Sequence, residues 1–418
     1  MDLDTSTFCV APWFHIRNHT NMEKSVCCAM KENLVPGSAD MQPLEYLNSE
    51  PIIKLKESLA KGIRPDACAR CWKKEDAGMK SLRNQENFLL SGNKYPETSW
   101  LNSYFKNKKD YKSDILISAE VKVGNTCNHN CVMCSPAYSS LIYADWSKRK
   151  SDSFVQEKLQ QDPKYLERSR SFSFRNPNYI EYIDNILTNN KHIRFLEFSG
   201  GEPFLNTILL NKLKALPDSV KSRLQIHFIT NGSMNFSQIC TDLGNFKSIS
   251  CNVSIEGVGR VQEWARYGSE WETLEQNIIE ARANNKITLS VWYCMQTSTI
   301  LGFPDLAKWC KSIDVPLNFN IVHDPDYLSL RCLPPVLQEK FLTSIQKYNK
   351  FLNSSNQVSM FEEEQSLSLE KLIENITNTE FSEKLLEKFY AYIDWYESNK
   401  NIERLRNIFP ELYEFKLK

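Results

Sequence analysis

The stretch Gly124–Pro136 constrains this chain most, because it places three cysteines in one short loop directly after a predicted strand. It reads Gly-Asn-Thr-Cys-Asn-His-Asn-Cys-Val-Met-Cys-Ser-Pro, so Cys127, Cys131 and Cys134 form a C-x3-C-x2-C pattern. Thiolates are soft ligands that select iron-sulfur clusters, zinc or copper(I), and this spacing lets one loop direct three sulfurs at one metal centre. The loop lacks a fourth cysteine, so a metal centre held there keeps an open coordination position.

The composition is that of an ordinary globular protein with an unusual number of cysteines. A chain of 418 residues is long enough for two or three domains. Its 51 basic and 51 acidic residues balance, which disfavours a nucleic-acid-binding protein and gives no signal for an anionic membrane surface. The first residues do not resemble a signal peptide and no apolar run is long enough for a membrane span, so we expect a cytoplasmic protein.

Thirteen cysteines in a reducing compartment are better interpreted as metal ligands than as disulfides. Seven of them have metal-ligand spacing. Another five are expected to be small packing residues of the core, namely Cys240, Cys251, Cys294, Cys310 and Cys332.

Between residues 113 and 325, apolar runs alternate with amphipathic segments, which is the pattern of repeated βα units around a parallel sheet. The pattern predicts an α/β fold with chemistry at the C-terminal ends of the strands. The six predicted strands are Ile115 to Val123, Arg194 to Phe198, Leu224 to Thr230, Ile249 to Ile255, Thr288 to Met295 and Pro316 to Val322.

The cysteine loop and its position after a buried strand resemble the radical S-adenosylmethionine (radical SAM) superfamily. The resemblance implies a partial (β/α)6 TIM-like barrel as the core, with Cys127, Cys131 and Cys134 holding a [4Fe-4S] cluster. It also implies that the open iron of this cluster binds the amino and carboxylate groups of S-adenosyl-L-methionine. The alternative for the three cysteines alone is a zinc knuckle.

A glycine motif follows the second predicted strand and is similar to the GGEP motif of the same superfamily. It consists of Ser199-Gly200-Gly201-Glu202-Pro203. Gly200 and Gly201 are expected to let the backbone approach the cofactor closely, and Glu202 to accept a hydrogen bond from the methionine amino group. A plain glycine turn before a helix is the alternative.

Three further residues are assigned to the cofactor by the resemblance. Ser254-Ile-Glu256-Gly257, at the end of the fourth strand, matches the position whose hydroxyl or carboxylate holds the ribose, and Ser254 is the residue assigned to that contact. Arg266 matches the arginine that pairs with the methionine carboxylate, a role suited to a bidentate guanidinium, although a surface arginine is the alternative. Met133 takes the place of a residue that packs on adenine, and its polarizable side chain suits that contact.

The first 112 residues carry a second set of cysteines with metal-ligand spacing. Cys68-x2-Cys71, with Cys9 and Cys27 upstream, is similar to the SPASM/twitch extension, which implies a second, auxiliary [4Fe-4S] cluster. That extension usually follows the core, whereas here it precedes it. Zinc remains an alternative to iron, and Cys28 competes with Cys27, because neighbours on an extended chain point to opposite faces.

These patterns divide the chain into an auxiliary-cluster module (1–112), the radical SAM core (113–325) and a helical C-terminal extension (326–418), whose apolar stripe we interpret as packing. Within the core, an insertion at about 151–192 is expected to form a helical cover over the barrel mouth. Its aromatic residues are Phe154, Tyr165, Phe172, Phe174, Tyr179 and Tyr182, interleaved with Arg168, Arg170 and Arg175.

The function implied by the resemblance is reductive cleavage of S-adenosylmethionine to a 5'-deoxyadenosyl radical, which abstracts hydrogen from a peptide or a small metabolite. An electron donor such as flavodoxin or ferredoxin would then be a partner. One alternative is a radical SAM enzyme that modifies RNA or nucleotides, which the neutral charge disfavours. The other is a non-catalytic iron-sulfur or zinc scaffold or regulator, for which a retained cofactor pocket has no use.

Overall fold

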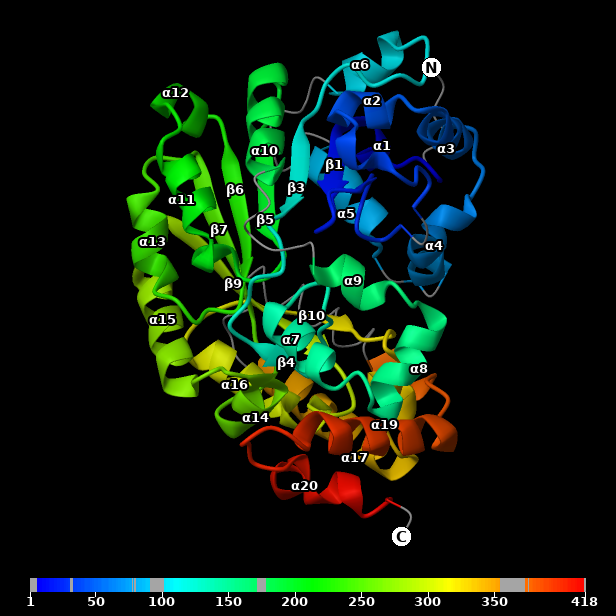
Figure 1. Cartoon of the computed structure of the whole chain (residues 1–418), viewed down its shortest axis with the longest axis vertical. Coiled ribbons are helices and arrows are strands. Elements are labelled where there is room, and N and C mark those ends of the chain that lie inside the picture. Colours follow the sequence, from blue (N-terminus) through cyan, green and yellow to red (C-terminus); the bar gives the residue numbers. More distant parts are fainter. Residues whose placement is uncertain are drawn as a thin grey trace.

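The chain folds around a mostly parallel β-sheet with helices packed on its outer face (Figure 1). The computed structural model describes residues 6–30, 33–76, 78, 80–90, 101–170, 178–353, 373–374 and 376–416. Within these residues the main sheet has eight strands in the order β10-β9-β7-β6-β5-β3-β1-β2. They are β1 (His15–Asn18), β2 (Lys24–Ser25), β3 (Ser118–Lys122), β5 (Phe195–Ser199), β6 (Gln225–Thr230), β7 (Ser248–Ser254), β9 (Ile287–Met295) and β10 (Leu317–Ile321).

The six predicted strands are confirmed as β3, β5, β6, β7, β9 and β10, and they pair in parallel in the order of the sequence. A helix connects each strand to the next, as expected for a partial barrel. In Figure 1, α11, α13 and α15 lie along one side of β6 and β7. The helices of this layer are α10 (Asn178–Asn189), α11 (Thr207–Lys214), α12 (Asp218–Lys221), α13 (Phe236–Asp242), α15 (Trp271–Ala283) and α16 (Phe303–Ser312).

The two faces of the sheet differ in polarity. In β7, Ile249, Cys251 and Val253 are buried, whereas the polar residues between them are half-buried. Successive side chains of a strand point to opposite faces, so the buried set packs under the helices and the polar set faces the hollow of the open barrel. A parallel sheet covered on both faces would instead have continuous apolar strands.

The sheet extends beyond the predicted core into the N-terminal segment. Strand β1 pairs in parallel with β3, from His15 opposite Ser118 to Asn18 opposite Val121, and β2 pairs antiparallel with β1 at the edge. Residues of the 1–112 segment therefore contribute to the same hydrogen-bonded sheet as the barrel strands.

The rest of the described N-terminal segment consists of short helices and the loops that connect them. Its longest described helix, α3 (Glu50–Ala60), matches the periodicity of Ile52, Leu55 and Leu59, and Gly62 ends it in a left-handed conformation with φ +79°. The other helices are α1 (Ala11–Phe14), α2 (Pro43–Leu47), α4 (Ala69–Asp76), α5 (Leu82–Leu90) and α6 (Leu101–Asn107).

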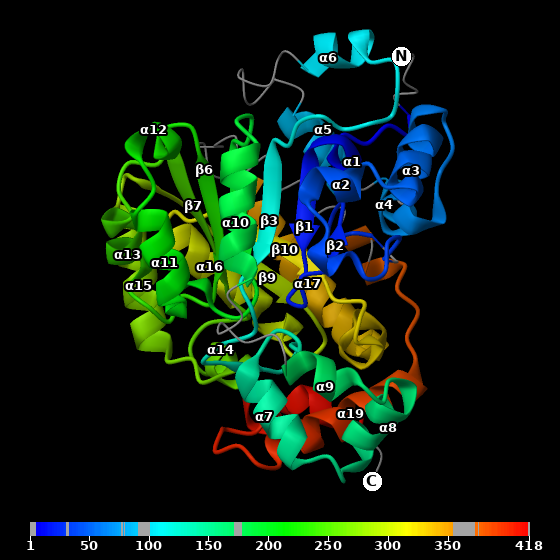
Figure 2. The same cartoon turned by 45° about the horizontal axis from the view of Figure 1, so that its top comes forward.

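The predicted insertion divides into two parts. Helices α8 (Ser153–Gln161) and α9 (Tyr165–Arg170) lie with α7 (Ser140–Lys148) beside the C-terminal helix α19 (Glu383–Glu397), as both Figure 1 and Figure 2 show. Helix α10 instead contacts β3 and buries Tyr179 and Tyr182 in the main core. Phe172, Phe174 and Arg175 lie outside the described residues.

The C-terminal extension contains α17 (Pro335–Asn353), α19 and α20 (Leu405–Ile408). The predicted stripe of α19 is confirmed at Leu385, Phe389 and Ile393, which are buried, and Trp395 is half-buried. Of the five predicted packing cysteines, Cys294 is half-buried and the other four are buried, namely Cys240, Cys251, Cys310 and Cys332. In the described part of the chain, each helix is too short or too polar to cross a bilayer.

Candidate functional site

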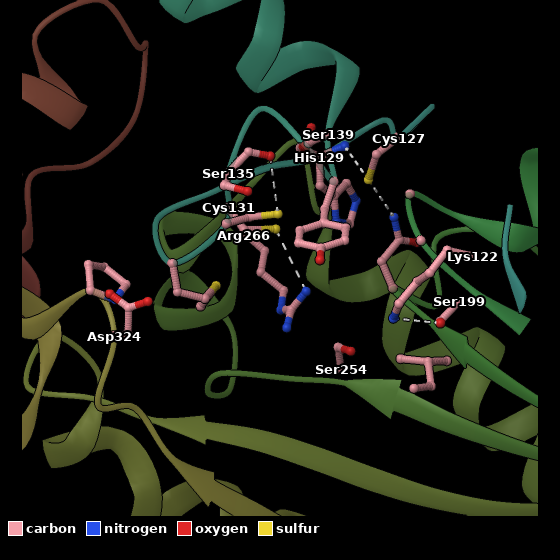
Figure 3. Close-up of a pocket in the computed structure, with 18 of the residues that line it drawn as sticks. Lys122, Cys127, His129, Cys131, Ser135, Ser139, Ser199, Ser254, Arg266 and Asp324 are labelled. Atoms are coloured by element: carbon pink, nitrogen blue, oxygen red, sulfur yellow. Dashed lines mark hydrogen bonds between the residues drawn. The ribbon is translucent and has the colours of Figure 1, made fainter. Parts of the chain in front are cut away.

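A cavity of about 750 Å³ lies at the C-terminal ends of the parallel strands (Figure 3). Of the nine residues predicted for the cluster loop and the cofactor, eight line this cavity, and Glu202 is the exception. The eight are Cys127, Cys131, Met133, Cys134, Gly200, Gly201, Ser254 and Arg266. Residues of α8 and α9 complete the wall, including Lys158 and Tyr165.

The cysteine loop is fixed by pairing with a segment far along the chain. The short strand β4 (Asn130–Cys131) pairs antiparallel with β8 (Arg266–Tyr267), which places Cys131 opposite Arg266. The Val132 amide also donates to the Ala265 carbonyl at 2.8 Å. The loop that carries the thiols is thus held at the ends of the barrel strands by backbone hydrogen bonds.

Polar donors point at two of the three sulfurs. A guanidinium nitrogen of Arg266 lies 3.7 Å from Cys131 Sγ, and Asn231 Nδ2 lies 3.8 Å from Cys127 Sγ. A neutral thiol is only a weak acceptor, whereas a metal-bound thiolate is anionic and is stabilised by such donors. The surroundings of these sulfurs therefore suit thiolates.

In the ligand-free structure the thiols are held in their neutral form. Burial raises the pKa of Cys127 to about 12, and burial also raises the pKa values of Cys131 and Cys134. Metal binding at these sulfurs therefore requires release of their protons. In the described residues no three Cys, His, Asp or Glu side chains lie close enough together to hold a single metal ion.

The two glycines after β5 allow their backbone to pack closely against the backbone at the start of the cysteine loop. A Cβ on Gly201 would lie 2.0 Å from the Thr126 carbonyl oxygen, and a Cβ on Gly200 would lie 2.6 Å from the Gly124 carbonyl oxygen. The Gly201 and Glu202 amides each donate at 2.8 Å, to Gly124 and Thr126 respectively. Besides lining the cavity, the glycines allow this loop to contact the start of the cysteine loop directly.

Glu202 is completely buried and its carboxylate is already hydrogen-bonded within the protein. Its oxygens accept from the Phe204 amide at 3.0 Å, from Thr230 Oγ1 at 2.8 Å and from the Asn231 amide at 2.7 Å. Burial raises its pKa to about 7, although these donors oppose the shift. The structure thus places Glu202 as a link between β5 and the end of β6, and its contact with the cofactor amine stays a prediction.

Arg266 is paired with the buried carboxylate of Glu256, a contact that was not predicted from the sequence. Its guanidinium donates to Glu256 Oε1 at 2.7 Å, and Glu256 also accepts from the Cys294 amide at 3.0 Å. The remaining nitrogen, Nε, is buried without a hydrogen-bond partner in the described part of the chain. Arg266 therefore lines the cavity with an unsatisfied donor while it stabilises the Glu256 carboxylate.

Ser254 and Met133 take the positions expected of residues that contact the cofactor. Ser254 ends β7 on the polar face of the sheet, across the cavity from the cysteine loop (Figure 3). Met133 is partly buried and lines the same cavity beside Cys134. Their assigned contacts with ribose and adenine stay predictions.

His129 is a cavity residue that the sequence interpretation missed. It lies within the cysteine loop, is almost completely buried, and lines the cavity (Figure 3). Neither of its ring nitrogens has a hydrogen-bond partner in the described part of the chain. Burial lowers its pKa to about 3, so the imidazole is neutral and offers one donor and one acceptor to a polar ligand.

The four N-terminal cysteines predicted as ligands lie around one small pocket, together with Arg83 and Glu86. They are Cys9, Cys27, Cys68 and Cys71. Burial and the neighbouring Cys27 thiol raise the pKa of Cys9, and burial raises the pKa of Cys68 to about 12. Cys28 does not line this pocket; burial and Glu120, a residue of β3, raise its pKa to about 11.

Helix α19, predicted to be a packing element, also contacts the cysteine loop through tyrosine hydroxyls. Tyr396 donates to the Asn130 carbonyl at 2.7 Å, and Tyr392 donates to the Val132 carbonyl. Both tyrosines are buried. The C-terminal extension therefore supports the loop that carries the three thiols.

Comparisons with known proteins found only distant similarity. No family model matches the chain and no curated protein matches it. Among solved structures, "Native anSMEcpe with bound AdoMet" matches with 20% identity and a TM-score of 0.40, over 58% of this chain and 63% of that chain. "Native anSMEcpe with bound AdoMet and Cp18Cys peptide" matches with 16% identity and a TM-score of 0.36, over 58% and 62%. The chain thus spans less than two thirds of the length of these proteins.

The contact between α19 and the cysteine loop predicts a local effect of Tyr396→Phe. Losing the hydroxyl leaves a buried carbonyl without its donor, at a cost of about 1 to 3 kcal/mol. We expect faster amide hydrogen exchange across residues 127–134. Tyr390→Phe is the matched control, because Tyr390 on the same helix donates to Leu412 instead. Equal exchange of the loop in both variants would show that α19 does not support it.

Proposed function

We propose that this protein is a radical SAM enzyme, in which Cys127, Cys131 and Cys134 hold a [4Fe-4S] cluster that binds S-adenosylmethionine. The observation that carries the proposal is the arrangement of thiols at the cavity. Three cysteines of one loop line it at the strand ends, and no fourth cysteine of the described residues does so. A closed structural metal site would need that fourth ligand.

The residues around the thiols fit such a cluster and cofactor. Arg266 and Asn231 present donors to the sulfurs, which suits the anionic thiolates of a cluster. Arg266 Nε and both ring nitrogens of His129 are buried and unsatisfied at the same cavity. Such groups are costly unless a polar ligand satisfies them, so they support binding of a ligand with several polar groups.

The bound cluster would supply one electron to S-adenosylmethionine, whose cleavage gives methionine and a 5'-deoxyadenosyl radical that abstracts hydrogen from the substrate. The protein's own residues position the reactants and exclude water. Ser254 and Arg266 are assigned to the ribose and the methionine carboxylate, and Met133 to the adenine. Helices α8 and α9 cover the cavity, with Tyr165 in its wall.

We further propose that residues 1–112 form an auxiliary-cluster module and that 113–325 form the catalytic core, followed by the helical extension. The pocket lined by four cysteines supports the auxiliary [4Fe-4S] cluster, because four thiolates close such a cluster without an open site. A peptide or small metabolite is the proposed substrate, and a reduced flavodoxin or ferredoxin the proposed electron donor in the cytoplasm.

The central prediction concerns cofactor cleavage. Protein reconstituted anaerobically with iron and sulfide, and then reduced, should convert S-adenosylmethionine to 5'-deoxyadenosine, measured by liquid chromatography. Replacing Cys127, Cys131 and Cys134 together by Ala should abolish this product, because these thiols hold the proposed cluster. Cys310→Ala, at a buried cysteine of α16, is the control and should retain it. Product formation by the triple variant would show that the assignment is wrong.

Iron content tests the second cluster separately. Wild-type protein should bind about eight irons per chain and the triple variant about four, because the four N-terminal cysteines hold their own cluster. Four irons in the wild type, with zinc bound at Cys68 and Cys71, would contradict the auxiliary cluster and leave the first prediction untouched.

Arg266 is tested by a variant pair that separates cofactor binding from folding. Arg266→Ala should weaken S-adenosylmethionine binding by about 2 to 5 kcal/mol, the usual cost of truncating one partner of a desolvated charge pair. The same change leaves Glu256 buried and unpaired, which costs roughly 3 to 5 kcal/mol of stability.

Adding Glu256→Gln should recover most of that stability and leave cofactor binding weak. Calorimetric titration and thermal unfolding measure the two effects. Recovery of both in the double variant would assign Arg266 a structural role only.

A further inference from the structure

A row of polar residues crosses the inner face of the sheet, next to the cavity. Arg17, Glu120, Glu197, His227 and Ser250 occupy paired positions on five neighbouring strands, β1, β3, β5, β6 and β7. Paired positions carry side chains on the same face, so these residues lie side by side. Apart from Asn18, which is polar, their strand neighbours on the opposite face are apolar and buried.

One carboxylate of the row, Glu120, lies between Arg17 and a second cation, Lys122, which is two residues farther along β3. Glu120 Oε2 lies 3.1 Å from Arg17 Nε, and Glu120 Oε1 lies 2.8 Å from the amino group of Lys122. Ser199 bridges Lys122 and Glu120, because its hydroxyl accepts a hydrogen bond from Lys122 at 2.7 Å and lies 3.3 Å from Glu120. Although burial opposes it, Lys122 and Arg17 lower the pKa of Glu120 to about 2, so this carboxylate is ionised.

The other titratable groups of the row do not balance the second cation. Burial lowers the pKa of His227 to about 4, so its imidazole is neutral. Burial and the neighbouring Glu120 raise the pKa of Glu197 to about 8, so that carboxyl group is mostly protonated at neutral pH. Arg17 and Lys122 therefore share Glu120 as their ionised partner.

The two cations are directed at the cavity. Arg17 and Lys122 both line it, whereas Glu120 does not. In the described part of the chain, Arg17 forms an ion pair with Glu120, with Nε as its closest nitrogen at 3.1 Å, and its guanidinium makes no hydrogen bond to a protein group. A guanidinium with free terminal nitrogens beside an ammonium group is suited to an oxyanion.

We propose that Arg17 and Lys122 bind an anionic group of the substrate, a carboxylate or a phosphate. This inference rests on the proposed function and adds the chemical class of its substrate. It also gives the N-terminal segment a direct part in recognition, because Arg17 lies on β1, which that segment adds to the barrel sheet.

The position of the two cations favours the substrate over the cofactor as the source of the anion. Ser254 lies on β7, three strands away from Lys122 on β3, and neighbouring strands are about 4.8 Å apart. Arg17 lies one strand farther still. Arg266, assigned to the cofactor carboxylate, follows β7 in the chain and contacts the cysteine loop. The cation pair is thus several strands away from Ser254 and apart from Arg266, although Gly200 and Gly201, also assigned to the cofactor, follow β5 next to Lys122.

The test is calorimetric titration of the reconstituted, S-adenosylmethionine-loaded protein with two probes, glutarate and inorganic phosphate. Glutaramide is the neutral control for glutarate. We expect at least one anion to bind and glutaramide not to bind, and the better probe distinguishes a carboxylate from a phosphate site. Arg17→Gln and Lys122→Gln should each weaken binding about tenfold or more, since each removes a charged donor.

Two further variants keep the test decisive. Glu120→Gln removes the internal anion that competes for both cations, and should strengthen probe binding about tenfold. Lys158→Gln removes a cation from another wall of the same cavity and should change the affinity for the probe less than twofold. If Lys158→Gln weakened probe binding as much as Arg17→Gln does, or if Glu120→Gln did not strengthen it, the anion would be attracted by a diffuse positive potential. Either result would overturn the proposed site. No binding of either anion would overturn it as well.

The cofactor is the remaining competitor for the anion site. If Arg17→Gln weakens S-adenosylmethionine itself tenfold, and neither probe binds the loaded protein, the site belongs to the methionine carboxylate and the substrate assignment is overturned. The proposed function fails by a different result, which is absence of 5'-deoxyadenosine. Glutarate or phosphate binding through Arg17 and Lys122 would still establish the anion site in that case.

Discussion

The contact between two backbone segments, Gly124–Thr126 and Gly200–Glu202, is the constraint on which the rest of the site depends. Two amides of one segment donate to two carbonyls of the other, and a side chain on Gly200 or Gly201 would overlap those carbonyls. The contact joins the ends of β3 and β5, so it fixes where the cysteine loop leaves the sheet. The hydrogen bonds of Glu202 to the end of β6 continue this frame to a third strand.

The second side of the cysteine loop is held by elements from distant parts of the chain. Strand β8 pairs with it directly, and the tyrosines of α19 bind its carbonyls. Because backbone N–H and C=O groups of the loop are hydrogen-bonded in this way, its three thiols and His129 can face the cavity. A rigid frame around partly unsatisfied polar groups is what a preorganised ligand site requires.

The polarity of the sheet explains how a substrate could reach this centre. Apolar residues on the outer face anchor the helices and provide the stability of the barrel. The inner face does not pack against these helices, and it carries polar and charged residues from β1 to β7. The charged groups therefore lie where they are costly for folding and available for recognition, which is typical of a functional face.

Local patterns in the sequence were enough to predict the six barrel strands, the cysteine loop and eight of the residues that line the cavity. Each of these has a signal within a few residues, such as the cysteine spacing or the alternation in β7. Strand β1 was not predicted, because four residues become a strand only by pairing with β3, about a hundred positions later. The Tyr396–Asn130 contact joins residues 266 positions apart, and Glu256 gains its importance only from Arg266. Such contacts depend on tertiary structure and leave no local pattern.

The most direct test of the central claim is electron paramagnetic resonance of the reduced, reconstituted protein before and after addition of S-adenosylmethionine. To isolate the relevant cluster, the spectrum is recorded on a variant with Cys68 and Cys71 replaced by Ala. The structure predicts a [4Fe-4S] signal that shifts when S-adenosylmethionine binds the open iron at Cys127, Cys131 and Cys134. A [4Fe-4S] signal that does not change with saturating S-adenosylmethionine, or the absence of any cluster signal in this variant, would contradict the assignment.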